Sequence, residues 1–185
     1  MAVSSAARVV SPLQGLDQYM LEKQLIDIRT KFSWIPNGVT ASRMSAMRPD
    51  RPNGACTRFI YTGAIGNVNE LDTITDGFVT HAKRIQNTVL DIYGDGPKRP
   101  AIQAKIDRIG MSDRVRFMGR IDRSQVPVEL AASNWAVLGI ANMPRLYSYG
   151  FSANKLAEYM AAGLPICMVG DFPGNPVREH DAGLV

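Results

Sequence analysis

Four polar residues near the end of the chain are spaced for ligand binding: Ser152, Asn154, Lys155 and Glu158. Apolar residues follow at helical spacing up to Gly163, so a helix is predicted to start at Ser152, whose hydroxyl would cap it. A helix start is partly positive, and with Lys155 beside it this end suits a phosphate. Glu158, one turn further on, can accept hydrogen bonds from two sugar hydroxyls. The alternative is an ordinary capped helix with a solvated Lys–Glu pair.

Glycines also punctuate the turns that follow apolar segments. Gly63, Gly66 and Asn67 share a loop in which backbone N–H groups could approach a phosphate, and Gly119 precedes Arg120 where main chain could meet a flat base. The turn at residues 93–97 (YGDGP) lacks the third glycine and the downstream acid of a dinucleotide fingerprint, which argues against an NAD site. Plain strand-to-helix turns are the alternative for all three.

Bulk composition excludes several classes of protein. The 185 residues are 45% hydrophobic and 21% charged, with a net charge of +4, as in a soluble globular domain, and nucleic acid is not an expected partner. Cys56 and Cys167 lie far apart outside any Cys/His cluster, and no Asp-x-Asp pair occurs, so neither a disulfide framework nor a metal site is expected. No apolar run reaches the roughly 18 residues of a membrane span. We expect a cytoplasmic protein, with a peripheral contact at the inner face of the cell membrane left open.

From residue 57 onward, short apolar segments alternate with segments of helical period. Strands are predicted at residues 58–62, 88–93, 114–118, 135–140 and 165–169, and helices near 71–85, 102–109 and 124–132 and from Ser152. Strands that are apolar on nearly every residue and separated by helices indicate a parallel sheet covered on both faces. The fold class is therefore α/β, a doubly wound parallel sheet of Rossmann-like type, in which ligands bind at the carboxyl ends of the strands.

The first part of the chain breaks this alternation. A strand is predicted at residues 8–11, a helix at 13–24 and a turn within 32–39, while residues 41–56, rich in Arg, Pro, Asn and Gly, indicate an exposed connector. A lone strand and helix cannot bury their own apolar face. We therefore predict three parts: residues 1–40 as the tail of another domain, 41–56 as a linker and 57–185 as a separate domain.

Five segments together carry a family resemblance. They are residues 35–38 (IPNG), 61–66 (YTGAIG), 91–97 (DIYGDGP), 115–119 (VRFMG) and 149–165 (YGFSANKLAEYMAAGLP). In this order and spacing they resemble the retaining GT-B glycosyltransferases of the group 1 family, especially the branch that builds bacterial capsule and lipopolysaccharide sugars. The resemblance covers about residues 7–185.

The resemblance implies the C-terminal half of a GT-B fold, which binds a nucleotide diphosphate sugar, with UDP favoured and with no further cofactor and no metal. Residues 1–40 would be the tail of the acceptor-binding domain, and the C-terminal domain would continue past residue 185. The full-length enzyme would transfer a sugar to an acceptor hydroxyl in surface polysaccharide biosynthesis, whereas this chain alone would be inactive.

The resemblance also assigns roles by position. Glu158 would accept from the ribose hydroxyls, and Ser152, Asn154 and Lys155 would face the diphosphate and the sugar. Gly63, Gly66 and Asn67 would line the phosphate side, and the main chain of Gly119 and Arg120 would meet the base. Catalytic residues stay unassigned.

Three positions depart from the family pattern. Ala64 and Asn69 stand about where many members carry a phosphate-clamping Arg and Lys, and Gly150 stands where many carry a glutamate. Two other hypotheses remain: a non-catalytic nucleotide-sugar-binding module that works with a separate acceptor-domain chain, and a structural α/β domain of flavodoxin-like kind.

Overall fold

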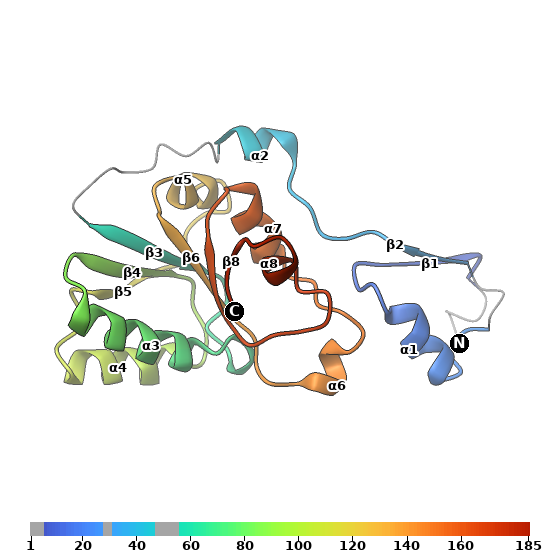
Figure 1. Ribbon diagram of the computed structural model, residues 1–185, viewed down its shortest axis with the longest axis horizontal. Helices are drawn as coiled ribbons and strands as arrows, with labels where there is room; N and C mark the ends of the chain where they lie inside the picture. Colours follow the sequence, from blue (N-terminus) through green and yellow to red (C-terminus); the bar gives the residue numbers. More distant parts are fainter. Residues whose placement is uncertain (1–5, 28–30, 47–55) are drawn as a thin grey trace.

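A six-stranded parallel sheet forms the centre of the protein (Figure 1). The computed structural model describes residues 6–27, 31–46 and 56–185. The strands are β3 (Thr57–Thr62), β4 (Thr88–Tyr93), β5 (Val115–Gly119), β6 (Trp135–Gly139), β7 (Ile166–Val169) and β8 (Gly183–Leu184). Their order is β5-β4-β3-β6-β7-β8, and each neighbouring pair runs parallel. The chain thus proceeds outward in both directions from the middle of the sheet, as predicted for a doubly wound fold.

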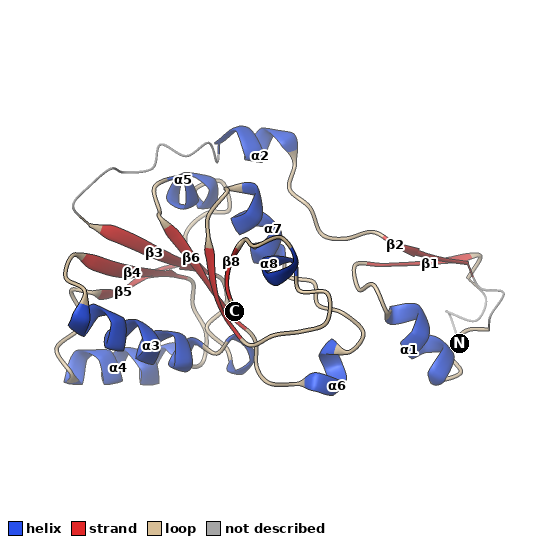
Figure 2. Ribbon diagram, viewed as in Figure 1, coloured by secondary structure: helices blue, strands red, loops and turns tan. Residues whose placement is uncertain are grey.

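Helices cover both faces of this sheet (Figure 2). They are α3 (Leu71–Arg84), α4 (Arg99–Arg108), α5 (Val126–Ala131), α6 (Pro144–Tyr147), α7 (Asn154–Ala161) and α8 (Pro176–Glu179), with a 3-10 turn, η1 (Asn67–Asn69). Helices α3 and α4 share one core cluster with the sheet, and α5, α7 and α8 share the other. Within the described ranges, no helix is both long enough and apolar enough to cross a bilayer.

The two core clusters follow from the alternation of side chains along each strand. In β3, Ile60 packs into the α5–α7 cluster and Tyr61 into the α3–α4 cluster, and both are fully buried. In β6, Leu138 likewise packs into the α5–α7 cluster and Val137 into the α3–α4 cluster. Burial on both faces explains why these strands are apolar on nearly every residue.

Helix α7 begins later than predicted, so the expected cap is wrong. Ala153, not Ser152, is the N-cap residue of α7. Ser152 lies one residue too early for its hydroxyl to cap the first turn, and this hydroxyl instead accepts a hydrogen bond from the Asn37 side chain at 2.8 Å. The β3–β7 strand boundaries agree with the prediction to about one residue, while α6, α8 and β8 were not predicted because each is only two to four residues long.

The N-terminal part forms a small β-α-β unit. Strands β1 (Arg8–Ser11) and β2 (Lys31–Trp34) pair in parallel, and α1 (Leu16–Glu22) lies between them in the chain. The strand at residues 8–11 and the helix were predicted, whereas β2 was not. The tail-linker-domain division stays a prediction, and residues 47–55 of the predicted linker lie outside the described residues. Residues 41–46 of the predicted linker form a helix, α2 (Ala41–Ala46).

Candidate functional site

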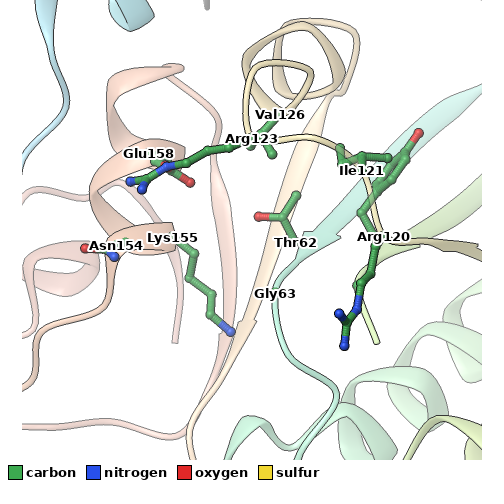
Figure 3. Close-up of a pocket in the computed structure, with 11 residues that line it drawn as sticks. Thr62, Gly63, Arg120, Ile121, Arg123, Val126, Asn154, Lys155 and Glu158 are labelled. Carbon is green, nitrogen blue, oxygen red and sulfur yellow. The ribbon is translucent and has the colours of Figure 1, made fainter. Parts of the chain in front are cut away.

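A cavity of about 490 Å³ opens where β3 and β4 end (Figure 3). Its lining residues are Thr62, Gly63, Tyr93, Gly94, Arg120, Ile121, Arg123, Val126, Asn154, Lys155 and Glu158. We call it the strand-end cavity. It lies beside the point where the strand order reverses, since β3 has β4 on one side and β6 on the other. Ligands of doubly wound sheets bind at such points, outside the carboxyl ends of the strands.

The structure brings together most, but not all, of the residues singled out in the sequence. Gly63, Arg120, Asn154, Lys155 and Glu158 line the strand-end cavity. The residues outside that lining are Gly66, Asn67, Gly119 and Ser152. Ser152 instead lines a second cavity of about 690 Å³, together with residues of the N-terminal unit. The late start of α7 explains this placement, because Ser152 belongs to the loop before the helix.

Lys155 presents a cation to the strand-end cavity. Its Nζ donates to the Tyr61 hydroxyl and to Oδ1 of Asn69, each at 3.0 Å, and lies 4.6 Å from the centre of the Tyr61 ring. No carboxylate in the described ranges forms a salt bridge with it. Burial lowers the pKa of Lys155 to about 8. The amine is therefore held by neutral groups and lacks a counter-ion, which an anionic ligand could supply.

The Gly63 loop folds around this lysine. The Tyr61 hydroxyl donates to the Ala64 carbonyl at 2.7 Å, and the Asn69 amide donates to the same carbonyl at 3.0 Å. Gly63 has φ +139, and a Cβ there would lie 3.2 Å from Nζ of Lys155. A glycine is thus needed both for the backbone conformation and for the close approach of the cation. Asn69, noted in the sequence only as a departure from the family pattern, helps to position Lys155.

Glu158 lies on the same side of α7 but turns away from Lys155, as Figure 3 shows. Its Oε1 accepts from Nη1 of Arg43 at 2.6 Å, and the residue is 9% exposed. The alternative of a solvated Lys–Glu pair is therefore not what the structure contains. Arg43 lies in the predicted linker, and sequence reasoning did not connect it with the site.

Several lining residues were also missed. They are Thr62, Tyr93, Gly94, Ile121, Arg123 and Val126. Their common signal is their place at a strand end, in the loop after β5 or at the start of α5. Tyr93 is fixed there because its hydroxyl donates to Glu129 at 2.7 Å and accepts from Arg58 at 2.8 Å. Burial raises the pKa of Tyr93 to about 12, so this residue contributes a neutral wall.

The charges around the strand-end cavity favour an anion. Lys155, Arg120 and Arg123 line it, and Glu158 is the acidic residue in the lining. Arg120 is 81% exposed and lies 3.8 Å from Asp95, a weak pair in water. In the part of the chain that the structure describes, no cluster of three or more His, Cys, Asp or Glu side chains is suited to hold a metal ion.

A doubly wound parallel sheet with helices on both faces defines a Rossmann-like α/β class of domain. Residues 56–185 match the model of the family "Glycosyl transferases group 1". Since this match spans more than half of the chain, the chain belongs to that family.

Individual relatives agree with this assignment. The lipopolysaccharide core biosynthesis glycosyltransferase LpsD of Rhizobium meliloti (strain 1021) is 42% identical over 43 residues, or 23% of this chain and 12% of LpsD. WaaG, a glycosyltransferase involved in lipopolysaccharide biosynthesis, superposes with a TM-score of 0.72 at 16% identity, covering 95% of this chain and 48% of WaaG.

The pneumococcal O-GlcNAc transferase GtfA, solved in complex with UDP and GlcNAc, superposes with a TM-score of 0.67 at 18% identity, covering 92% of this chain and 31% of GtfA. The chain therefore spans less than half the length of each of these relatives. The structural likeness confirms the predicted fold, which is part of a GT-B glycosyltransferase.

Proposed function

We propose that the strand-end cavity binds a nucleotide diphosphate sugar. The chain would be the donor-binding part of a glycosyltransferase that moves a sugar to an acceptor hydroxyl in surface polysaccharide biosynthesis. The observation that carries this proposal is the partly buried Lys155, which has neutral partners only and lies at the start of α7 with Glu158 one turn further on. Family membership and the activities of LpsD and WaaG support it.

Each part of the donor has a matching group in the cavity. The diphosphate would lie against Lys155, the first turn of α7 and the Gly63 loop, where a cation and backbone N–H groups converge. The ribose hydroxyls would donate to Glu158. The base would rest on the loop that begins with Arg120. A volume of about 490 Å³ is in the usual range for such ligands, and UDP is favoured because GtfA was solved with it.

Sugar transfer requires the cavity to stabilise the departing nucleoside diphosphate. The acceptor oxygen forms a bond to the anomeric carbon, the bond from that carbon to the diphosphate breaks, and the electron pair stays on the diphosphate. The hydroxyl proton is released in the same process. Negative charge therefore grows on the diphosphate, where Lys155 and the positive end of α7 would stabilise it.

We propose that the acceptor is held by an N-terminal domain of the full-length protein. Such a protein would work in the cytoplasm, at the inner face of the cell membrane, where the precursors of surface polysaccharides are glycosylated. The net charge of +4 suits an anionic surface.

Calorimetric titration with UDP, GDP and ADP tests the donor-binding role. We expect UDP to bind and Lys155→Ala and Glu158→Ala each to weaken it about tenfold, the loss expected for one charge-assisted hydrogen bond. Lys105→Ala is the matched control, because Lys105 pairs with Asp76 on the surface. Equal affinities for all of these proteins would refute the assignment, as would an absence of binding to any of the three nucleotides.

One further outcome would favour the non-catalytic alternative. A chain that binds the donor, and supports sugar transfer only when a separate acceptor-domain polypeptide is added, would be a nucleotide-sugar-binding module. Stabilisation by no nucleotide at all in thermal unfolding would instead favour the structural α/β domain.

A further inference from the structure

Helix α2 brings an arginine from outside the predicted donor domain to the strand-end cavity. The helix lies against α5, as Figure 1 shows, and Arg43 extends from it to α7. Nη1 of Arg43 contacts Oε1 of Glu158 at 2.6 Å, and Nη2 donates to the carbonyl of Arg123 at 3.3 Å. Arg43 thus joins two walls of the cavity, the α7 wall and the loop after β5.

The contact differs from the surface ion pairs of this protein. The side chains of Arg43 and Glu158 are 22% and 12% exposed, whereas those of Arg178 and Asp171, which pair at 2.8 Å, are 61% and 46% exposed. An exposed pair contributes little, whereas the burial of a carboxylate is costly unless an opposite charge and hydrogen bonds compensate for the lost hydration. Arg43 provides that partner.

A diphosphate bound next to a carboxylate would be repelled by it. The ligand and Glu158 are both negative, and a bound nucleotide would remove the remaining water from the carboxylate. Lys155 does not relieve this, because its amine points to Tyr61 and Asn69. A second cation must neutralise Glu158 from the side that the ligand does not occupy.

We propose that Arg43 is a positioning residue of the nucleotide site, which neutralises Glu158 and fixes its carboxylate for the ribose hydroxyls. This inference rests on the proposed function, since it assumes that Glu158 meets the ribose. Because Arg43 donates to Oε1 of Glu158, the Glu158 side chain is held in one rotamer, and this fixes the position of Oε2. Residues 41–46 would then contribute a side chain to the donor site in addition to connecting the two domains.

The test compares two nucleotides that differ only at the ribose. UDP and 2′,3′-dideoxy-UDP are titrated by calorimetry into the whole chain and into Arg43→Ala, Arg43→Lys, Glu158→Ala and Arg178→Ala. Arg178→Ala is the matched control, because it removes an arginine from an exposed carboxylate pair on α8. Thermal unfolding of each variant shows that it is folded at the temperature of the titration.

We expect Arg43→Ala to weaken UDP binding about tenfold, which corresponds to the loss of one charged hydrogen-bonded partner. Arg43→Lys restores part of this affinity. Dideoxy-UDP keeps the diphosphate but lacks the hydroxyls that Glu158 would accept, so its affinity should fall less than that of UDP in Arg43→Ala, because only the charge neutralisation and not the ribose contact is lost. Arg178→Ala binds both ligands like the unaltered chain.

Two results overturn the inference in distinguishable ways. If Glu158→Ala weakens UDP but Arg43→Ala leaves it unchanged or tightens it, Arg43 is a mere surface contact or a competitor for Glu158, and the proposed function stands. If Glu158→Ala and Lys155→Ala both bind UDP like the unaltered chain, or if UDP does not bind at all, the proposed function fails and the inference falls with it.

Discussion

Nζ of Lys155 lies 3.0 Å from the hydroxyl oxygen of Tyr61 and 4.6 Å from the centre of its ring. The tyrosine gives the ammonium a hydrogen-bond acceptor and a π-face but no negative charge. Holding a partly buried cation in this way costs folding free energy, because the lost hydration is only partly replaced. A cost of this kind is common at binding sites, where a ligand supplies the missing charge.

Replacing Lys155 should therefore weaken UDP binding without lowering the free energy of unfolding. In Lys155→Met the apolar side chain retains most of the packing and removes the desolvation cost, so the free energy of unfolding should stay the same or rise by about 1 kcal/mol. UDP affinity should fall about tenfold or more, as one charged hydrogen bond is lost. Urea unfolding and calorimetry measure the two quantities. A variant that loses stability and keeps its affinity would contradict the ligand-binding role of this lysine.

The lowered pKa of Lys155 predicts a pH dependence of binding. With a pKa of about 8, the amine loses its proton as the pH rises above that value, and the attraction to the diphosphate is lost with it. UDP affinity should fall above pH 8 by at most about tenfold per pH unit. Bound UDP should raise this pKa, so binding near pH 8 should take up protons, which calorimetry in buffers of different ionisation enthalpy detects. Lys155→Met should show neither effect.

The same group predicts how stability changes with pH without a ligand. In the unfolded chain Lys155 has its ordinary pKa of 10.5, while in the fold its pKa is about 8. Between these values the unfolded chain holds more protons, so the contribution of this group to the free energy of unfolding rises with pH. Urea titrations of the unaltered chain and of Lys155→Met should show a difference that changes in this window. A constant difference would show that the pKa is not lowered.

Two glycines, one that lines the strand-end cavity and one inside α3, allow a matched pair of variants. Gly94 has φ +142, and a Cβ there would lie 1.8 Å from the carbonyl oxygen of Gly63. Gly94→Ala should therefore lower the free energy of unfolding by more than about 3 kcal/mol. Gly77 lies inside α3, and a Cβ added there would have nothing within 4 Å, so Gly77→Ala should stabilise by about 0.5–1 kcal/mol. Urea midpoints that move in the same direction would contradict this account.

A buried ion network below the cavity should matter for stability. Asp91 is fully buried, and its carboxylate accepts from Arg58 at 2.5 Å and from Arg116 at 2.6 and 2.8 Å. Asp91→Ala leaves Arg116 without its carboxylate and Arg58 with Glu129 alone, and should cost about 3 kcal/mol. Asp76→Ala is the control, because Asp76 pairs with Lys105 on the surface and should cost less than about 1 kcal/mol. Equal losses in urea unfolding would show that burial does not strengthen this network.

The fold could be predicted from the sequence because its signals are local. Runs such as residues 135–139, apolar on nearly every position, have one favourable environment, the inside of a covered parallel sheet. The start of α7 was predicted one residue too early, because Ser152 has the chemistry of a cap, whereas its hydroxyl accepts a hydrogen bond from Asn37 instead. Short elements such as α8 carry too few residues to show a period.

The candidate site was predicted only in part, because some of its contacts join residues that are far apart in the sequence. Asn154, Lys155 and Glu158 are neighbours on one helix, so their common direction follows from helical geometry. The contact of Arg43 with Glu158 spans 115 residues, and no local pattern indicates it. The roles of Asn69 and Tyr61 at Lys155 likewise depend on how a loop folds back onto α7.

A crystal structure of this chain with UDP bound is the most direct test of the central claim. The account predicts a diphosphate oxygen within about 3 Å of Nζ of Lys155, as in a charge-assisted hydrogen bond, and the ribose hydroxyls on Glu158. A nucleotide bound in the second cavity beside Ser152, with the strand-end cavity empty and Lys155 still on Tyr61 and Asn69, would contradict it.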